Sequence, residues 1–331
     1  MINNFSIGGE FYGNKFYENN PILNKFKYGT WTLSGRSALE LIFKNNPEFL
    51  NKTIYLPIYN CPSVHKIIKK YFKKIIFYDL KKNFEPNIKK FKKNSVLILT
   101  NYFGHKSISR FDKNLIVIED LSHLLLNNLK FKKNRIYFLS LRKFGIFNFG
   151  GWTNLKLNNI YKSEINYLES FRKKKLEYLN LKKKNLNTEY KLLNLFKKEE
   201  KKIFKKTICV SKKQIKALTK IPDKTLILIR KSNFNFLRKN IRLSFSNLIY
   251  KKRETPLFFF IKFFNIRKRN KVRNFLKTKN IYCPILWDLN TYNLSKYPNA
   301  KEFSEKTLAL PIDHRFNIED MKYIVKNLKK I

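Results

Sequence analysis

The chain of 331 residues is poor in cysteine, in acidic residues and in long apolar runs. Its three cysteines, Cys61, Cys209 and Cys283, are widely separated and lack the spacing of metal ligands. We therefore expect no metal site and reduced, packed thiols, as in a cytoplasmic protein. No apolar run approaches the roughly 20 residues of a membrane span, and the first residues lack the basic stretch and apolar core of a secretory signal. Both absences favour a cytoplasmic location without membrane insertion.

The shortage of acidic residues leaves 23 of them against 71 basic ones, for a formal net charge of +48. Such a charge suggests nucleic-acid binding, because Lys and Arg neutralise phosphates. However, only 13 of the basic residues are arginine, and lysine is abundant together with Asn, Ile, Phe and Tyr, which all have A/T-rich codons. The lysines are also spread along the chain. We interpret them as solvated faces and expect no specific nucleic-acid partner, only weak binding to polyanions at low salt.

The apolar content is that of a packed globular protein, with 43% hydrophobic residues and 31 phenylalanines. Short, nearly all-apolar segments alternate with segments of helical spacing in the first half, which predicts a doubly wound α/β domain with a mostly parallel sheet. The expected strands are 53–57, 75–78, 96–100 and 115–118, and the expected helices are 38–43 and 64–72.

The second half contains a lysine-rich helical pattern over about 160–204. Strand signals return at 257–263 and 281–286, with a helix at 270–277 and a last helix beginning near Asn317. We therefore predict a large domain over residues 1–246, which includes the lysine-rich helical segment at about 160–246, and a small C-terminal α/β domain over 247–331.

Acidic, imidazole and amine side chains follow two of the expected strands. Asp120 ends one apolar run, His123 comes three residues later, and Lys143 follows the next run. A pyridoxal phosphate enzyme needs such a set: a carboxylate keeps the pyridine nitrogen protonated, and an amine forms the Schiff base with the cofactor aldehyde and shuttles the proton. Ligands in open α/β sheets bind beyond the carboxyl ends of strands. The three residues are therefore candidate catalytic groups, although a lone histidine is more often structural.

Each of these residues also has a plainer interpretation. Asp120 could cap a helix at a strand-to-helix turn. Lys143 is one of many lysines and could lie on the surface at the end of a hairpin. Its apolar flanks, Ser140 before it and the glycine pair at 150–151 after it, single it out, since a catalytic lysine must be partly desolvated.

Residues 33–38 predict a strand–loop–helix junction around Gly35. Backbone N–H groups at a helix start, together with serine hydroxyls, can bind a phosphate. The same pattern also simply starts helices, so the segment alone does not define a site.

Several segments together resemble the DegT/DnrJ/EryC1/StrS family of pyridoxal phosphate-dependent sugar aminotransferases. The resemblance covers most of the chain and is looser in the helical middle. The segments that carry it are Ile7-Gly8-Gly9-Glu10-Phe11, Ser34-Gly35-Arg36-Ser37-Ala38-Leu39, Leu56-Pro57-Ile58-Tyr59-Asn60-Cys61-Pro62, Asn101-Tyr102-Phe103-Gly104, Val117-Ile118-Glu119-Asp120 with His123, Ser140-Leu141-Arg142-Lys143, Ile281-Tyr282-Cys283-Pro284 with Trp287, and Leu310-Pro311-Ile312-Asp313 with Glu319-Asp320-Met321.

The resemblance implies the fold-type-I architecture and a homodimer with active sites at the subunit interface. It implies that Lys143 forms the Schiff base with pyridoxal 5'-phosphate and that Asp120 binds the pyridine nitrogen. It places His123 at the oxygen side of the cofactor. An amino acid, expected to be glutamate, would donate the amino group, and a keto-sugar, expected to be nucleotide-linked, would accept it for cell-surface polysaccharide or amino-sugar biosynthesis. Lys143 would carry the proton as a general acid and base.

The resemblance also assigns the phosphate site. Gly35, Arg36 and Ser37 would contact the phosphate, and Ser140 would add a hydroxyl. Many relatives stack an aromatic ring on the cofactor from the segment where this chain has Cys61. Here we expect Tyr59 to take that role.

The usual Gly-x-Asn-x-Arg segment, which reaches the phosphate site of the neighbouring subunit, is not evident after Gly151. The chain therefore looks like a divergent branch, similar to members in surface-polysaccharide clusters. A second hypothesis follows: a protein that keeps the fold for binding or structure and has lost turnover. Relatives that are dehydratases replace the lysine with histidine, which Lys143 argues against.

Overall fold

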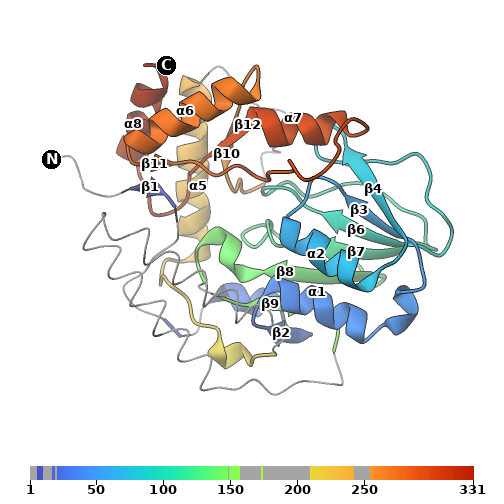
Figure 1. Ribbon diagram of the computed structural model, residues 1–331. Helices are drawn as coiled ribbons and strands as arrows, with labels where there is room; N and C mark the ends of the chain where they lie inside the picture. Colours follow the sequence, from blue (N-terminus) through green and yellow to red (C-terminus); the bar gives the residue numbers. More distant parts are fainter. Residues whose placement is uncertain are drawn as a thin grey trace. The chain divides into compact units, whose positions relative to one another are not determined.

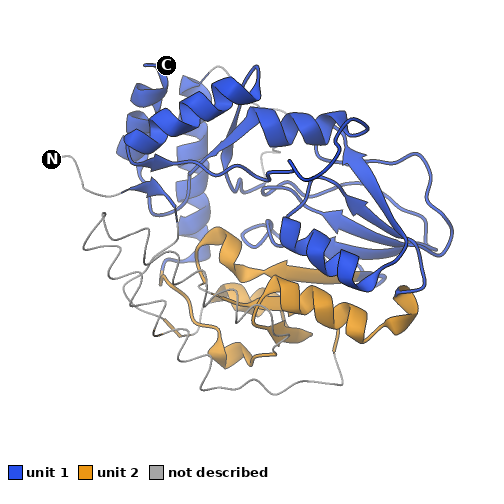
Figure 2. Cartoon of the chain, viewed as in Figure 1, with its two compact units in different colours: residues 1–10, 50–135, 221–331 blue, residues 11–49, 136–220 orange. Residues whose placement is uncertain are grey.

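The computed structural model describes residues 6–9, 17–18, 21–147, 149–156, 173, 209–241 and 254–331. The chain forms two compact units that interleave along the sequence (Figure 2). Unit 1 comprises Met1–Glu10, Leu50–Arg135 and Ile221–Ile331, and unit 2 comprises Phe11–Phe49 and Ile136–Lys220. The predicted lysine-rich helix over 160–204, apart from Lys173, and the predicted boundary between 246 and 247 lie outside the described residues. The division into domains 1–246 and 247–331 therefore stays a prediction.

The main sheet of unit 1 is mostly parallel. Its strands lie in the order β7-β6-β3-β4-β5. Strands β7, β6, β3 and β4 (labelled in Figure 1) run parallel, and β5 pairs antiparallel with β4. The bounds are β3 Ile54–Pro57, β4 Ile75–Leu80, β5 Pro86–Asn87, β6 Val96–Thr100 and β7 Ile116–Asp120. All residues of β3 and β6 are buried, as expected for parallel strands covered on both faces. Helix α2, Pro62–Tyr71, connects β3 to β4.

The C-terminal part of unit 1 has its own small sheets and core. Its elements are α5 Asp223–Asn240, β10 Phe259–Lys262, α6 Ile266–Thr278, β11 Ile281–Tyr282, α7 Pro298–Lys306, β12 Thr307–Leu310 and α8 Ile318–Leu328. Strands β10 and β12 pair antiparallel, and β1, Ile7–Gly8, pairs parallel with β11. Apolar residues of β10, β12, α6 and α8 share one core, which Ile7 and Phe234 join.

Unit 2 is built on an antiparallel sheet of order β2-β9-β8. The strands are β2 Thr30–Thr32, β8 Arg135–Ser140, whose first residue belongs to unit 1, and β9 Gly151–Thr153. Helix α1, Gly35–Lys44, follows β2, and short 3-10 helices cover Pro21–Lys25, Pro47–Phe49, Leu141–Phe144 and Lys212–Gln214. The β8–β9 connection therefore contains the 3-10 helix in which Lys143 lies.

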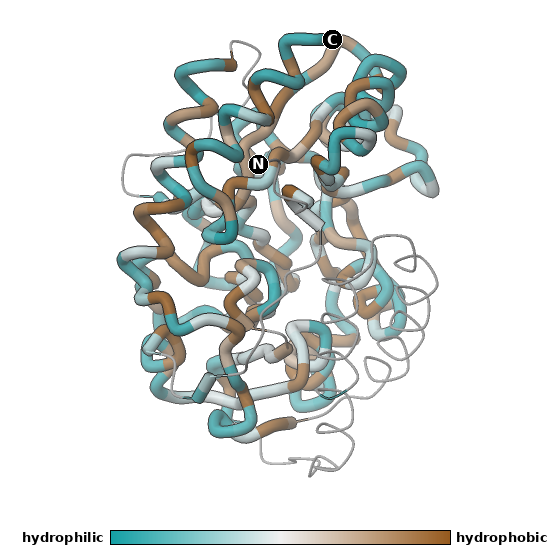
Figure 3. Tube along the Cα trace, turned by 90° about the vertical axis from the view of Figure 1, so that its left-hand side faces the viewer, coloured by the Kyte–Doolittle hydropathy of each residue, from teal (hydrophilic) through white to brown (hydrophobic). Residues whose placement is uncertain are grey.

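These elements confirm the predicted mixed α/β class with a large, mostly parallel sheet. The strand at 96–100 has the predicted bounds, and the last helix begins at Ile318 with Asn317 as its N-cap, next to the predicted start near Asn317. Polar and apolar residues alternate along the helices (Figure 3), as they do in helices that bury one face. Among the described residues no helix combines the length and apolar character needed to cross a membrane.

Candidate functional site

Asp120 occupies the carboxyl end of a parallel strand of unit 1. It is the last residue of β7, opposite Thr100 of β6, and it is 7% exposed. Its Oδ1 accepts the backbone N–H of Ser122 at 2.8 Å, and its carbonyl oxygen accepts Nδ2 of Asn101 at 2.9 Å. The alternative of a helix cap does not apply, because a turn follows β7. A buried carboxylate is thus fixed where ligands bind in α/β sheets.

His123 is held in one protonation form by the main chain. Its Nδ1 accepts the backbone N–H of Phe103 at 3.1 Å. A nitrogen that accepts a hydrogen bond carries no proton, so the ring is neutral with its proton on Nε2. The ring lies nearly parallel to the rings of Phe103 and Trp287, with interplanar angles of 19° and 15°, in a cluster where Phe103 and Trp287 also contact each other. His123 can therefore offer a hydrogen-bond donor at Nε2.

Tyr59 lies in an aromatic cluster of unit 1 and is 0% exposed. Its ring contacts five other aromatic rings, and burial raises the pKa of its hydroxyl. The neighbours are Phe84, Tyr102, Phe103, Trp287 and Phe303. A cofactor would reach this ring only after these neighbours moved. The stacking role of Tyr59 stays a prediction.

Unit 2 contains the predicted phosphate segment at the N-terminus of α1. Ser34 is the N-cap, and its Oγ accepts the backbone N–H of Ser37 at 3.2 Å and lies 3.1 Å from Ser37 Oγ. The first turn contains no acidic residue, and Arg36 there is half-buried. The helix N-terminus, with its positive dipole end and serine hydroxyls, is suited to an anion. Ser34 was not among the predicted ligands, although Ser-x-x-Ser before an apolar run is a recognisable cap signal.

Two glycines bring this helix start close to the strands that flank Lys143. A β-carbon on Gly35 would lie 3.0 Å from Cβ of Ser140, and one on Gly151 would lie 2.3 Å from the carbonyl carbon and oxygen of Ser34. The N–H of Leu141 donates to the carbonyl of Gly150 at 2.9 Å. Unit 2 thus brings together the start of α1, Ser140 and the glycine pair.

Lys143 lies in the 3-10 helix Leu141–Phe144, which ends at Gly145 with a φ of 72°. It is half-buried, whereas Leu141 and Phe144 on either side of it are buried. The lysine therefore has the partly desolvated surroundings that an amine nucleophile needs. In agreement with its alternative interpretation, it also lies in the connection of a hairpin.

The donor sets fit pyridoxal phosphate. Unit 1 supplies a buried carboxylate, which suits a protonated ring nitrogen, and a neutral imidazole N–H, which suits a phenolic oxygen. Unit 2 supplies a helix N-terminus free of acidic residues, in a cradle that a β-carbon on Gly35 or Gly151 would fill, and a half-buried lysine. Within the described residues, no three His, Cys, Asp or Glu side chains gather as a metal site would require.

Comparisons with known proteins agree with this fold. No protein-family model and no curated protein matches the chain. Among solved structures, however, the chain has the fold of sugar aminotransferases of the DegT/DnrJ/EryC1/StrS type, and this confirms the predicted pyridoxal phosphate-dependent transferase fold.

Three structures illustrate the likeness. Spr1654 from Streptococcus pneumoniae, assigned as a sugar aminotransferase and solved in a PLP form, is similar at 13% identity and a TM-score of 0.60, over 95% of this chain and 92% of that one. CalS13, a sugar aminotransferase from Micromonospora echinospora, is similar at 10% identity and 0.60, over 96% and 93%. A DegT DnrJ EryC1 StrS aminotransferase from Brucella abortus is similar at 10% and 0.55, over 95% and 91%.

Proposed function

We propose that this chain is a pyridoxal phosphate-dependent aminotransferase that moves an amino group from an amino acid, glutamate first, to a keto-sugar. The observation that carries the proposal is the pair of donor sets: Asp120 with His123 in unit 1, and Lys143 with the α1 N-terminus in unit 2. They occur in a fold shared with sugar aminotransferases. Fold alone would not define the activity, because one fold hosts many functions.

When bound, the cofactor supplies an aldehyde that reacts with amines and a ring that draws negative charge away from the substrate carbon. Asp120 would bind the protonated ring nitrogen, and the Nε2–H of His123 would donate to the phenolic oxygen. The N–H groups of α1, Arg36 and the hydroxyls of Ser37 and Ser140 would hold the phosphate.

Lys143 would act twice, first as the amine that holds the cofactor and then as an acid and base. Its Nζ would take the proton from the α-carbon of the amino donor and deliver a proton to the cofactor carbon that was the aldehyde carbon. Glutamate would leave as its keto acid before the keto-sugar enters.

We further propose that the acceptor is nucleotide-linked, that the enzyme serves amino-sugar or surface-polysaccharide synthesis in the cytoplasm, and that it works as a homodimer. The support is the sequence resemblance to surface-polysaccharide members and the three free cysteines. A screen of nucleotide keto-sugars for amine formation tests the first point, and sedimentation equilibrium tests the last.

Lys143→Ala tests the central assignment. Purified protein incubated with pyridoxal phosphate should gain visible absorbance, and borohydride reduction followed by peptide mass analysis should place the cofactor on Lys143. The variant should lose this covalent label. Lys213→Ala, an exposed lysine of the same unit, should keep it.

Two results would redirect the proposal. A label on another lysine would make the Lys143 assignment wrong. Cofactor absorbance that glutamate does not change would favour the second hypothesis, a protein that keeps the fold without turnover. Absence of any cofactor binding would contradict the aminotransferase proposal.

A further inference from the structure

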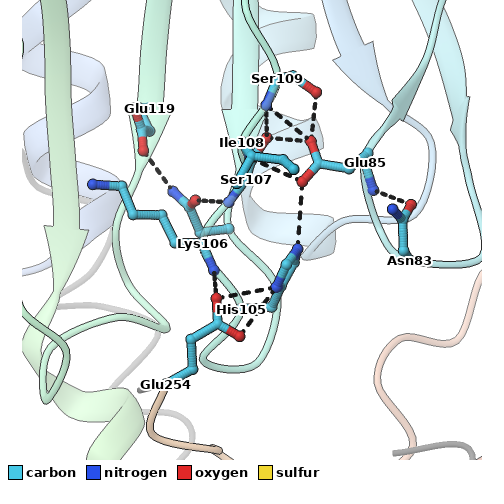
Figure 4. A network of polar contacts seen from close by, with 10 residues as sticks. Asn83, Glu85, His105, Lys106, Ser107, Ile108, Ser109, Glu119 and Glu254 are labelled. Atoms are coloured by element: carbon cyan, nitrogen blue, oxygen red, sulfur yellow. Dashed lines mark hydrogen bonds and ion pairs between the residues drawn. The ribbon is translucent and has the colours of Figure 1, made fainter. Parts of the chain in front are cut away.

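Unit 1 contains a buried ion network outside the proposed donor sets (Figure 4). His105, which is 6% exposed, has its Nε2 3.3 Å from Oε1 of Glu85 and its Nδ1 3.2 Å from the carboxylate of Glu254. Ionised carboxylates only accept hydrogen bonds, so both ring nitrogens must donate, and His105 is an imidazolium. Burial opposes this charge, but Glu254 and Glu85 outweigh it and raise the pKa of His105 to about 9.

Glu85 gathers the loop that follows His105. Its carboxylate accepts the hydroxyl of Ser107 at 2.6 Å, the backbone N–H of Ile108 at 3.0 Å and both the N–H and the hydroxyl of Ser109. Burial works against the charge of Glu85, yet the hydrogen bonds from His105 and the two serines lower its pKa to about 2. The loop 105–109 is therefore wrapped around a charged carboxylate (Figure 4).

Glu254 fixes the same loop from the other side. It accepts the backbone N–H of Lys106 at 3.1 Å. Three residues further on, the N–H of Leu257 donates to the carbonyl of Phe103 at 2.7 Å. The two segments are in contact, because a β-carbon on Gly104 would lie 2.1 Å from the carbonyl oxygen of Thr255. The backbone around Phe103 is thus bonded to the segment 254–257, while the residues after it are bonded to Glu85.

The loop connects the network to the candidate catalytic residues. Phe103 donates its N–H to Nδ1 of His123 at 3.1 Å. Asn101 accepts the N–H of Ser107 at 2.9 Å and donates to the carbonyl of Asp120 at the same distance. Hydrogen bonds therefore link Glu85 through Ser107 and Asn101 to Asp120. The backbone of the same loop joins His105 to the Phe103 N–H that binds His123.

We propose that Glu85, His105 and Glu254 form a positioning network that holds the Phe103 N–H against Nδ1 of His123 and so keeps the His123 proton on Nε2. His105 acts through the loop and touches no substrate. What His123 does for a cofactor rests on the proposed function, whereas its tautomer is a property of the chain itself. Other titratable side chains near the network are Tyr78 of β4, whose pKa is raised by burial and by Glu85, and Glu119, which accepts Nδ2 of Asn101 and pairs with Arg135.

Imidazole nitrogen spectroscopy tests the proposal directly. The chain has only four histidines, so protein labelled with ¹⁵N-histidine gives four ring patterns, which four single His→Gln variants assign. In the wild-type protein without cofactor we expect His105 doubly protonated at neutral pH and His123 with its proton on Nε2. In His105→Gln the His123 pattern should shift toward exchange between the two tautomers.

Two further variants separate positioning from general damage. Glu254→Gln keeps the imidazole and should shift the His123 pattern in the same direction. His65→Gln removes another buried histidine of unit 1, bonded to the carbonyl of Pro57 and to Tyr292, and should leave the His123 pattern unchanged. If the protein does bind cofactor, the half-reaction with glutamate should slow roughly tenfold in His105→Gln and Glu254→Gln, as expected for a misplaced donor.

Retention of the Nε2–H pattern of His123 in both His105→Gln and Glu254→Gln would overturn the proposal. A neutral His105 in the wild-type protein at neutral pH would also overturn it. The tautomer of His123 is measured without cofactor, so the positioning proposal can fail while Lys143 still forms its covalent link to the cofactor. Conversely, the tautomer pattern can be as expected while Lys143 remains unlabelled.

Discussion

At the scale of single residues, one backbone N–H decides what His123 can do. Because Phe103 donates to Nδ1, the imidazole can only donate from Nε2. The sequence indicated His123 as a candidate but not its tautomer, since the donor lies 20 residues away. Local spacing also gave no sign of His105, whose partner Glu254 is separated from it by 149 residues.

Gly35→Ala tests the close contact between the start of α1 and the end of β8. Alanine at a helix start would normally stabilise the protein by about 0.4–1 kcal/mol. Here the new β-carbon would lie 3.0 Å from Ser140 Cβ and 3.1 Å from the carbonyl of Leu139, so we expect a loss of roughly 1–2 kcal/mol and weaker cofactor binding. Urea unfolding measures the first effect and cofactor titration the second. A more stable Gly35→Ala protein would contradict the packing described.

His105 gives a pH dependence whose sign is fixed. Its pKa is raised from 6.5 to about 9 in the folded protein. The contribution of the charged ring to the free energy of unfolding is therefore complete below about pH 6.5 and is lost as the pH rises through about 9. The stability difference between wild type and His105→Gln should therefore shrink, by on the order of 2 kcal/mol, between neutral pH and about pH 10.

Urea unfolding at several pH values measures this difference. His65→Gln is the control: burial lowers the pKa of His65 to about 4, so the ring is neutral throughout that range and its difference should stay constant. A difference in unfolding free energy between wild type and His105→Gln that does not change with pH would mean that His105 is neutral in the folded protein.

At the scale of elements, apolar runs predicted the buried strands well. Residues 96–100 and 115–118 correspond to β6 and β7 because both strands are almost completely buried and so read as continuous apolar sequence. Strands β2 and β9 cover three residues each, which is too short for a period to show. Helix α7 was missed as well, because its lysines and glutamates mask three buried positions, Ala300, Phe303 and Ser304.

The candidate site was predicted in part for the same reason. Asp120 and the start of α1 adjoin elements that local sequence defines, so their positions followed from strand and helix signals. The burial of Tyr59 among five aromatic rings depends on contacts with residues as distant as Trp287 and Phe303. No local pattern encodes such long-range packing.

Asn317→Ala tests the capping box that begins α8. The Asn317 side chain accepts the N–H of Glu319 at 2.9 Å and of Asp320 at 3.1 Å, while the Asp320 carboxylate accepts the N–H of Asn317 at 2.9 Å. Loss of the cap should cost about 1 kcal/mol of unfolding free energy. Asn274→Ala, at an exposed position of α6, should change it by less than about 0.5 kcal/mol. Equal effects of the two substitutions would argue against the cap.

At the scale of the whole molecule, the net charge of +48 dominates behaviour in solution. We expect binding to RNA or heparin at low salt that weakens steeply as salt rises and shows no sequence preference, because only phosphate or sulfate neutralisation drives it. Fluorescence anisotropy with two RNAs of equal length and different sequence measures both properties. A strong preference for one sequence at physiological salt would favour a dedicated nucleic-acid function.

The three thiols differ in how easily a reagent can reach them. Cys209 and Cys283 are buried, and burial raises the pKa of the Cys283 thiol to about 12, which suppresses the reactive thiolate. Cys61 is half-exposed, immediately before α2 at the carboxyl end of β3. A maleimide dye should therefore label the native chain at one position, and a fluorescent reporter could be installed beyond β3 without removing any native cysteine.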